Sequence, residues 1–264
     1  MATAGRRVHF MRATLAIARN AIGEATHRMI FQVILLFGVL LVVGGSFFTY
    51  MNPGEEHKML TDLGLSIIAA FGMMLAIYMG VMSVQPEIER RTIYALLAKP
   101  VRRWEFVLGK FLGALVVLLV STVVMGLVLV AMLYVREGNL YPDMMKAVGT
   151  TFLGLGMMMA VVMMMSTVLS PLLTVICAVV LWIMGYMQSY LVQLAEHAQA
   201  GLVKMVIGVI GVLVPNIEKF DLRVQVVNQM RVEPGMVYSM VWYGLAYTAV
   251  VLILAIIFFN EKQV

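Results

Sequence analysis

The feature that most constrains this chain is a series of long stretches that contain no Asp, Glu, Lys, Arg or His. A helix needs about 20 residues to cross the roughly 30 Å of hydrocarbon in a bilayer. Five stretches reach that length: Met29–Gly54, Leu63–Pro86, Phe111–Val135, Ala147–Ala195 and Pro234–Asn260. Because unpaired backbone groups are costly in lipid, stretches of this kind cross it as helices. The sequence therefore predicts an all-α integral membrane protein.

The fourth stretch is about twice the length needed for one crossing, and Ser170-Pro171 lies near its middle. Proline lacks a helix donor and disfavours helix at the preceding residue, so we predict two spans joined by a tight turn there. The total is then six transmembrane helices. The shorter apolar stretch Met205–Pro215 is about half the needed length, which favours a re-entrant or interfacial external helix before the last span.

We expect a single transmembrane domain over residues 1–264 with no separate soluble module. Its predicted parts are an interfacial helix at 6–28, spans at 29–50, 63–84, 106–135, 147–169, 172–192 and 237–259, a cytoplasmic loop at 86–103, and an external segment at 196–233. The N-terminal part is predicted to be amphipathic because apolar or small residues recur there at three-four spacing while the arginines mostly fall elsewhere.

Basic residues gather on one side of the predicted spans. They precede the first span and fill the loop between the second and third: Arg6, Arg7, Arg12, Arg19, Arg28, Arg90, Arg91, Lys99, Arg102, Arg103 and Lys110. Loops rich in Lys and Arg stay in the cytoplasm, so both termini are predicted to be cytoplasmic. The formal net charge of +5 reflects this arrangement, and we expect membrane lipids rather than nucleic acid as the partner of these residues.

Several classes of function are disfavoured by what the sequence lacks. There is no phosphate-binding loop, because Trp104 stands where the first glycine before Gly109-Lys110 is required. The uncharged stretches contain no ionisable residue of the kind that ion-coupled carriers use at depth. The single cysteine, Cys177, excludes a thiolate metal site or a disulfide framework. We therefore expect no enzyme activity, no bound cofactor and no metal site in this chain.

Two compositional features have a simple and a sharper interpretation. The methionine runs Met157–Met159 and Met163–Met165 could bind Cu(I), but successive residues of a helix point in different directions, and packing is the favoured interpretation. Small residues at Gly72, Ala76 and Gly80 have the spacing that lets helices approach closely. That approach could be within the chain or between two chains.

The loop between the second and third predicted spans has the most informative order of residues. Pro86 suits the first position of a short helix, acidic residues suit its N-terminal turn, and Pro100 ends it. An Arg-Thr step, a leucine pair, a further arginine and Gly109-Lys110 follow in turn. This order resembles the corresponding loop of type-2 ATP-binding-cassette (ABC) transporter permeases, and the predicted topology extends the resemblance over nearly the whole chain.

The resemblance implies that this loop is a coupling helix docked on a separate ABC ATPase subunit. The residues that would receive the motion of the ATPase are Glu87, Ile88, Glu89, Arg90, Arg91, Thr92, Leu96, Leu97, Pro100 and Arg103. Two ATPase copies, which bind ATP and Mg, would join this chain and a second copy of it or a similar permease. The location implied is the cytoplasmic membrane of a bacterium or archaeon. A basic loop that only enforces topology is the alternative.

A second stretch, Pro215-Asn216-Ile217-Glu218-Lys219-Phe220, is similar to a segment of one subgroup of that family. The subgroup contains the permease of the nitrous-oxide-reductase maturation system. This similarity suggests a periplasmic protein partner that would contact Pro215, Asn216, Glu218 and Phe220.

Three functions remain open at this point. The first is export of a lipid-like or hydrophobic substrate through a conduit lined by 29–50, 63–84 and 172–190, because the lining is expected to be uncharged. The second is transmission of ATPase motion to a periplasmic partner without transport. The third is a membrane scaffold that only assembles other proteins.

Overall fold

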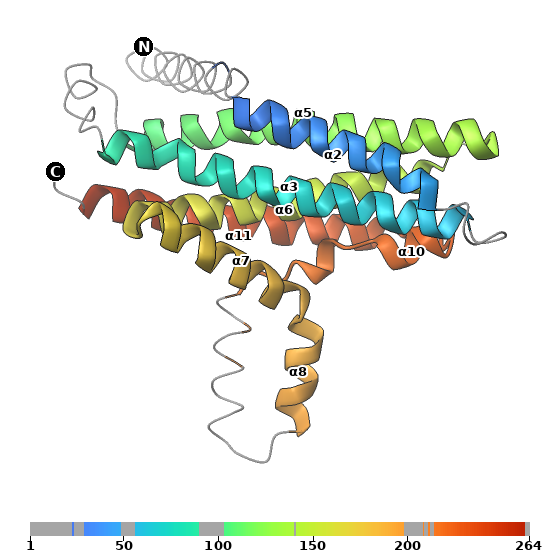
Figure 1. The fold of residues 1–264 in the computed structure, drawn as a ribbon. Coiled ribbons are helices and arrows are strands. Elements are labelled where there is room, and N and C mark those ends of the chain that lie inside the picture. The colour runs from blue at the N-terminus through green and yellow to red at the C-terminus, as the bar shows by residue number, and fades with distance from the viewer. Residues whose placement is uncertain are drawn as a thin grey trace, which may run out of the picture.

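The computed structural model describes residues 29–48, 56–89, 103–139, 141–197 and 214–261, together with the single residues Gly23, Gly208 and Gly211. Within these ranges the regular structure is helical (Figure 1). Except for Gly23, the predicted interfacial helix at 6–28 lies outside the described residues, as do most of the predicted re-entrant helix at 205–215 and loop residues 90–102.

Five long helices form a bundle in which the first four alternate in direction and the last, α11, runs in the same direction as α6 (Figure 1). They are α2 (Met29–Phe48), α3 (Glu56–Glu89), α5 (Arg103–Glu137), α6 (Pro142–Val168) and α11 (Pro234–Glu261). The bundle therefore has two ends, which we name after a residue at each. The Glu89 end also holds the turn between α6 and α7, and the Gly138 end holds the turn between α5 and α6.

Four described helices are long and apolar enough to cross a bilayer, namely α3, α5, α6 and α11. The pair formed by α7 (Pro171–Tyr186) and α8 (Gln188–His197) adds a fifth if it counts as one broken span. The 20-residue apolar helix α2 packs along α3 and α5. A multi-span helical membrane protein is thus established, whereas the count of six crossings stays a prediction.

The helices extend beyond the predicted spans at both ends. Helix α3 begins seven residues before the predicted span 63–84 and continues to Glu89. Pro86 therefore does not begin a separate helix, as the sequence suggested, but lies in the last turn of α3. A proline removes a single donor there, and the helix continues through it to Glu89.

Helices α3 and α6 form the centre of the bundle. In the most apolar window of each, 67% of the residues are buried, against 22% in α11. They approach closely where small residues face branched ones: a methyl group added at Gly72 would meet Leu155 at 2.3 Å, and one added at Gly80 would meet Val162 at 2.7 Å. The spacing of small residues therefore serves packing within the chain at these two positions.

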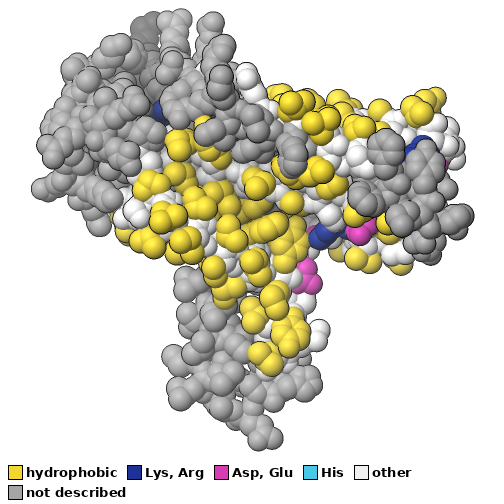
Figure 2. Space-filling model, viewed as in Figure 1, with side chains coloured by type: hydrophobic (Ala, Val, Ile, Leu, Met, Phe, Trp, Pro, Cys, Tyr) yellow, Lys and Arg dark blue, Asp and Glu magenta, His cyan; other side chains and the backbone are white. Residues whose placement is uncertain are grey.

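The methionine runs of α6 also belong to this core. Met157, Met158, Met159 and Met163 are at most 1% exposed. By contrast, hydrophobic side chains cover most of the described surface in the view of Figure 2. A bundle that is apolar both inside and outside is the expected form of a protein whose solvent is lipid.

Helix α7 ends early and departs from the predicted span 172–192. It has 16 residues, or about 24 Å of helix, which is shorter than the hydrocarbon layer. The chain then bends by 67° at Met187 into α8, which projects sideways from the bundle (Figure 1). The bend occurs where the chain that returns from α8 packs against the end of α7.

Candidate functional site

The chain that returns from α8 inserts between the long helices. This segment, Val214–Val227, contains the short 3-10 helix η2 (Glu218–Phe220) and the helix α10 (Arg223–Val227). Its centre is Phe220, which is 2% exposed. A methyl group added at Gly154 of α6 would lie 3.2 Å from this ring residue, and one added at Gly244 of α11 would lie 3.1 Å from it. Phe220 therefore packs against α6 and α11 at two positions where glycine leaves room for its side chain.

The same segment determines where α7 ends. The backbone N–H of Ile217 donates to the carbonyl of Gly185 at 3.2 Å. A Cβ at Gly185 would meet the carbonyl oxygen of Pro215 at 2.7 Å, so only glycine permits this approach. The Gln188 side chain donates to Val214 O at 2.7 Å, and the Glu218 carboxylate accepts from the N–H of Ser189 at 2.9 Å. The end of α7 and the start of α8 are thus held by the returning segment.

An ion pair follows Phe220 directly. Arg223 Nε donates to both carboxylate oxygens of Asp221 at 2.8 Å, and Nη2 donates to the same group. Nη1 donates to Ser66 Oγ of α3 at 2.7 Å, and the guanidinium lies 5.8 Å from the centre of the Tyr186 ring of α7. Two charges that are mostly buried are tolerated here because they are paired and hydrogen-bonded.

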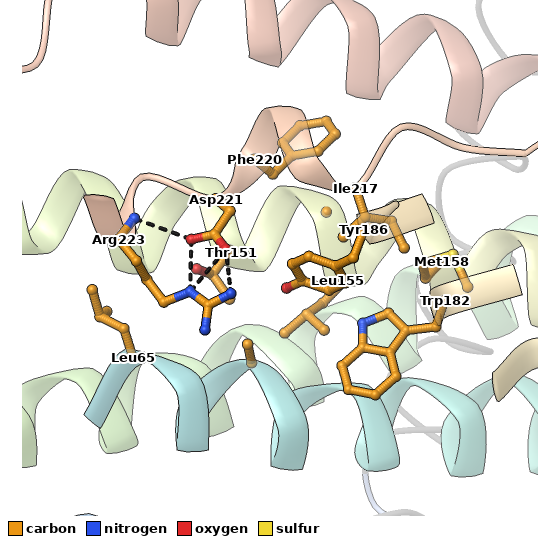
Figure 3. Close-up of a pocket in the computed structure, with 12 residues that line it drawn as sticks. Leu65, Thr151, Leu155, Met158, Trp182, Tyr186, Ile217, Phe220, Asp221 and Arg223 are labelled. Carbon is orange, nitrogen blue, oxygen red and sulfur yellow. Dashed lines mark hydrogen bonds and ion pairs between the residues drawn. The ribbon is translucent and has the colours of Figure 1, made fainter. Parts of the chain in front are cut away.

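These contacts surround a pocket between α3, α6, α7 and the returning segment (Figure 3). In the close-up, Trp182 and Tyr186 approach from α7, and Asp221 and Arg223 lie on the opposite side of the pocket. The lining residues are Leu65, Ala69, Thr151, Gly154, Leu155, Met158, Trp182, Tyr186, Ile217, Phe220, Asp221 and Arg223. The pocket is mostly apolar and aromatic, with one ion pair and two hydroxyl-bearing residues, Thr151 and Tyr186.

Two of the three segments predicted to line a conduit contribute to this pocket. Leu65 and Ala69 come from 63–84, and Trp182 and Tyr186 come from 172–190. The remaining lining comes from α6 and the returning segment, and 29–50 contributes none of these twelve residues. The pocket also contains Asp221 and Arg223, two charged residues that the sequence analysis assigned to the external segment. The sequence did offer a signal for this ion pair: an acidic and a basic residue, two positions apart, directly follow the aromatic residue Phe220.

The predicted coupling residues lie at the Glu89 end. The backbone of Pro86, Glu87, Ile88 and Glu89 continues α3 as helix, and Arg103 begins α5. Arg90, Arg91, Thr92, Leu96, Leu97 and Pro100 fall outside the described residues. The structure therefore places the first part of the predicted coupling loop on the end of a helix that passes through the core.

A residue that sequence reasoning did not single out lies just before this loop. Gln85 is 7% exposed, and its side-chain amide donates to Ser166 O at 3.0 Å and to Leu169 O at 2.7 Å. Both acceptors belong to the end of α6 and its turn into α7. The signal in the sequence was a lone amide at the end of an apolar run.

The residues predicted to meet a periplasmic partner are mostly internal. Pro215 is buried, and Phe220 is buried between the long helices of the bundle. Asn216 accepts from the N–H of Lys219 at 3.1 Å, and its own N–H donates to Tyr243 Oη at 3.0 Å. The described side chains of Pro215 and Phe220 therefore pack within the chain itself, and Asn216 and Glu218 are only partly exposed.

No cluster of three or more His, Cys, Asp or Glu residues that could hold a metal ion occurs among the described residues. The hydrogen-bonded groups His57, Glu137 and Tyr141 at the Gly138 end include only two residues of these types. The buried pocket likewise offers one carboxylate, which is already paired with Arg223.

Sequence comparison adds the remaining observation. The pattern that defines the ABC-2 family transporter proteins matches residues 15–264, which is nearly the whole chain. The chain belongs to this family. No curated protein matches the permease at the level of significance required. As a family member the permease is a non-catalytic transmembrane component of an ABC-2 type transporter, and family members pair with ATPase subunits.

Proposed function

We propose that the permease couples ATP hydrolysis by a separate ATPase subunit to the export of a lipid-like or hydrophobic substrate. The observation that supports this proposal best is the continuity of α3. One helix carries Leu65 and Ala69 in the wall of the pocket and Glu87 and Glu89 at the start of the predicted coupling loop. Because a packed helix moves as a body, force applied at its end reaches the pocket.

The working assembly would contain two permease chains, each with six crossings, and two ATPase subunits that bind ATP and Mg. Both termini and the loop 86–103 would be in the cytoplasm of a bacterium or archaeon. The ATPase would bind the segment from Glu87 to Leu97, and Pro100 and Arg103 would lie at the far end of the loop. Closure of the ATPase pair would then rock the bundles and open the conduit outward.

The chemistry of the pocket refines the class of substrate. Its wall offers Leu155, Met158, Trp182 and Phe220 for an apolar body, and the Asp221–Arg223 pair is its one charged feature. A bare ion would find no uncompensated opposite charge there, because the two charges neutralise each other. An apolar molecule with one polar group fits this lining better than a purely polar one.

The loop provides the test of ATPase coupling. We expect the double change Glu87→Ala and Glu89→Ala to reduce substrate-stimulated or partner-dependent ATPase activity, or to loosen the ATPase, while the chain still inserts into the membrane. Pull-down of the ATPase with the tagged permease and measurement of ATP hydrolysis would show this. Glu233→Ala, an exposed acidic residue beside α11 at the Gly138 end, is the matched control. Normal assembly and activity of the double variant would contradict the proposal.

A second candidate function is favoured by the shape of α8. This helix projects from the bundle and exposes Tyr190, Val192 and Leu194, with 59%, 52% and 47% of each residue accessible. Such a surface could pass ATPase motion to a periplasmic protein without transport. Stimulation of the reconstituted ATPase by a periplasmic protein, with no effect of a panel of lipids and drugs, would favour this candidate. Failure to purify any nucleotide-binding subunit after gentle extraction would instead favour a scaffold.

A further inference from the structure

Gln85 makes long-range polar contacts at the Glu89 end. Its side-chain amide forms two hydrogen bonds that cross from α3 to backbone carbonyls 81 and 84 positions away in the sequence. The amide has two N–H donors, so these two bonds use both of them. A buried amide bound in this way is held firmly, because losing the partners would leave its donors without acceptors in a medium of low polarity.

The acceptors lie at a point where the chain turns sharply. Ser166 is in the last turn of α6, whose final carbonyls have no donor from their own helix beyond Val168. Leu169 and Ser170 are extended and form the whole connection, and α7 starts at Pro171. The carbonyls at the end of α6 and in this two-residue turn therefore need a donor from outside α6. Gln85 supplies it from α3.

We infer that Gln85 is a positioning residue that ties the ends of α3, α6 and α7 together, so that motion received at the loop after it moves α7 as well as α3. The inference rests on the proposed coupling of this loop to an ATPase. Glu87 and Glu89 follow Gln85 in the same helical turn. Without the amide, the end of α3 could shift while the turn at Leu169 stayed in place.

The route continues from the turn to the pocket. Gly72 against Leu155 and Gly80 against Val162 hold α3 and α6 together along the bundle, and the Gln85 bonds hold their ends at the turn. Helix α7 makes fewer contacts with its own chain and exposes Leu172, Leu173 and Ile176. Its start is the part tied to α3 through Gln85, and its end carries Trp182 and Tyr186 into the pocket. Gln85 therefore connects the proposed ATPase side to the α7 wall of the pocket.

The test compares nucleotide-driven motion on two helices in the permease–ATPase complex reconstituted in liposomes. Cys177, the single cysteine, lies on α7 and carries one nitroxide spin label. A second sample carries the label at Met74→Cys on α3 in a Cys177→Ser background, since Met74 is 55% exposed. The change in the spectrum of the label on adding ATP and vanadate is measured for wild type and for two variants. Gln85→Leu keeps the size of the side chain but loses both N–H donors. Gln85→Asn keeps the amide, but its shorter side chain does not reach the carbonyls.

We expect the change at Cys177 to be at least about fivefold smaller in both variants, since fivefold corresponds to the loss of a single net hydrogen bond of average strength and Gln85 forms two. The change at Met74→Cys should be kept. Ser83→Ala is the matched control, because Ser83 Oγ bonds only Met79 O within α3, at 2.5 Å. That variant should leave both signals unchanged. A purely structural role would lower thermal stability without altering the ratio of the two signals.

The outcomes separate the two proposals. An undiminished response at Cys177 in Gln85→Leu, or in Gln85→Asn if the leucine variant does not fold, would overturn the role of Gln85 and leave ATPase coupling in place. Equal loss at both labels would also overturn it, because α3 would then have lost its own motion. Absence of any nucleotide response at either label in the wild-type complex would overturn the proposed coupling function itself.

Discussion

At the scale of single residues, the returning segment is held by side chains that fit spaces left by glycine. Phe220 fills the gap beside Gly154 and Gly244, and Gly185 admits the carbonyl of Pro215. Interiors packed to this density respond to changes of a single methylene. These positions therefore give direct tests of whether the segment lies where the structure places it.

Replacing Phe220 with alanine should destabilise the permease by about 3–5 kcal/mol, because it removes a buried ring and leaves a cavity between α6 and α11. Thermal or denaturant unfolding in detergent would measure the loss. Val224→Ala, at a residue of the same segment that is 67% exposed, should change stability by less than about 0.5 kcal/mol. If the two variants were equally stable, Phe220 would not be in the core.

Gly185→Ala should destabilise the protein by about 1–3 kcal/mol, because the added Cβ would meet a backbone oxygen at 2.7 Å and backbone cannot move aside as a flexible side chain can. The matched control is Gly149→Ala on α6, where nothing lies within 4 Å of the new Cβ. That change should be neutral or slightly stabilising, since alanine has the higher helix propensity. Comparison of the two melting temperatures checks the prediction, and the reverse order would contradict it.

At the scale of elements, a small polar group joins three helices at the Gly138 end. Glu137 at the end of α5 accepts from Tyr141 Oη at 2.6 Å and lies 2.9 Å from His57 Nδ1 of α3. The rings of His57 and Tyr141 are 4.5 Å apart. The hydrogen bond to Glu137, with a smaller effect of burial and of the carboxylate charge, raises the pKa of Tyr141 above its usual 10.0.

This shift predicts a dependence of stability on pH. A group whose pKa is raised by folding stabilises the folded state below its unfolded pKa, and the stabilisation is lost as the pH rises through the folded pKa. Wild type should therefore be more stable than Tyr141→Phe at neutral pH, by about 1 kcal/mol. The advantage should shrink as the pH rises above 10, where the phenolate faces the Glu137 carboxylate.

Unfolding of both proteins in detergent between pH 7 and pH 11 would test this expectation. Tyr134→Phe on α5 is the control, because Tyr134 is 51% exposed and lies near the same end of the bundle. The free energy of unfolding of Tyr134→Phe should differ little from that of wild type at every pH. A constant difference between wild type and Tyr141→Phe across the range would show that the hydrogen bond to Glu137 is not formed.

At the scale of the whole molecule, the bundle has two ends that should lie on opposite sides of the membrane. Basic residues predict that the Glu89 end is cytoplasmic. Asn139 and Ser170 are exposed at the Gly138 end and the Glu89 end, respectively. In a Cys177→Ser background, Asn139→Cys should react with a membrane-impermeant maleimide added to intact cells. Ser170→Cys should react only after the membrane is permeabilised. Labelling in the opposite order would reverse the orientation and place the coupling loop outside.

The crossing helices could be predicted from sequence alone because hydropathy is a local property that adds along the chain. Helices α3, α5, α6 and α11 match four of the six predicted spans to within one residue of covering them, and the turn at Ser170-Pro171 is where proline indicated it. The family could also be inferred from the order of residues around Glu87 and Leu97, and the match over residues 15–264 confirms it. Local chemistry was sufficient for each of these conclusions.

What only the tertiary structure decided are the contacts between residues far apart in sequence. Ile217 caps Gly185, Arg223 bonds Ser66 157 positions away, and Gln85 bonds the turn at Leu169. Neither the hydrophobic periodicity nor the composition of the sequence predicts these pairs. Each pair depends on which helices pack together and on how they are shifted along one another. That choice turned a segment predicted to be external into the wall of the pocket and ended α7 after 16 residues.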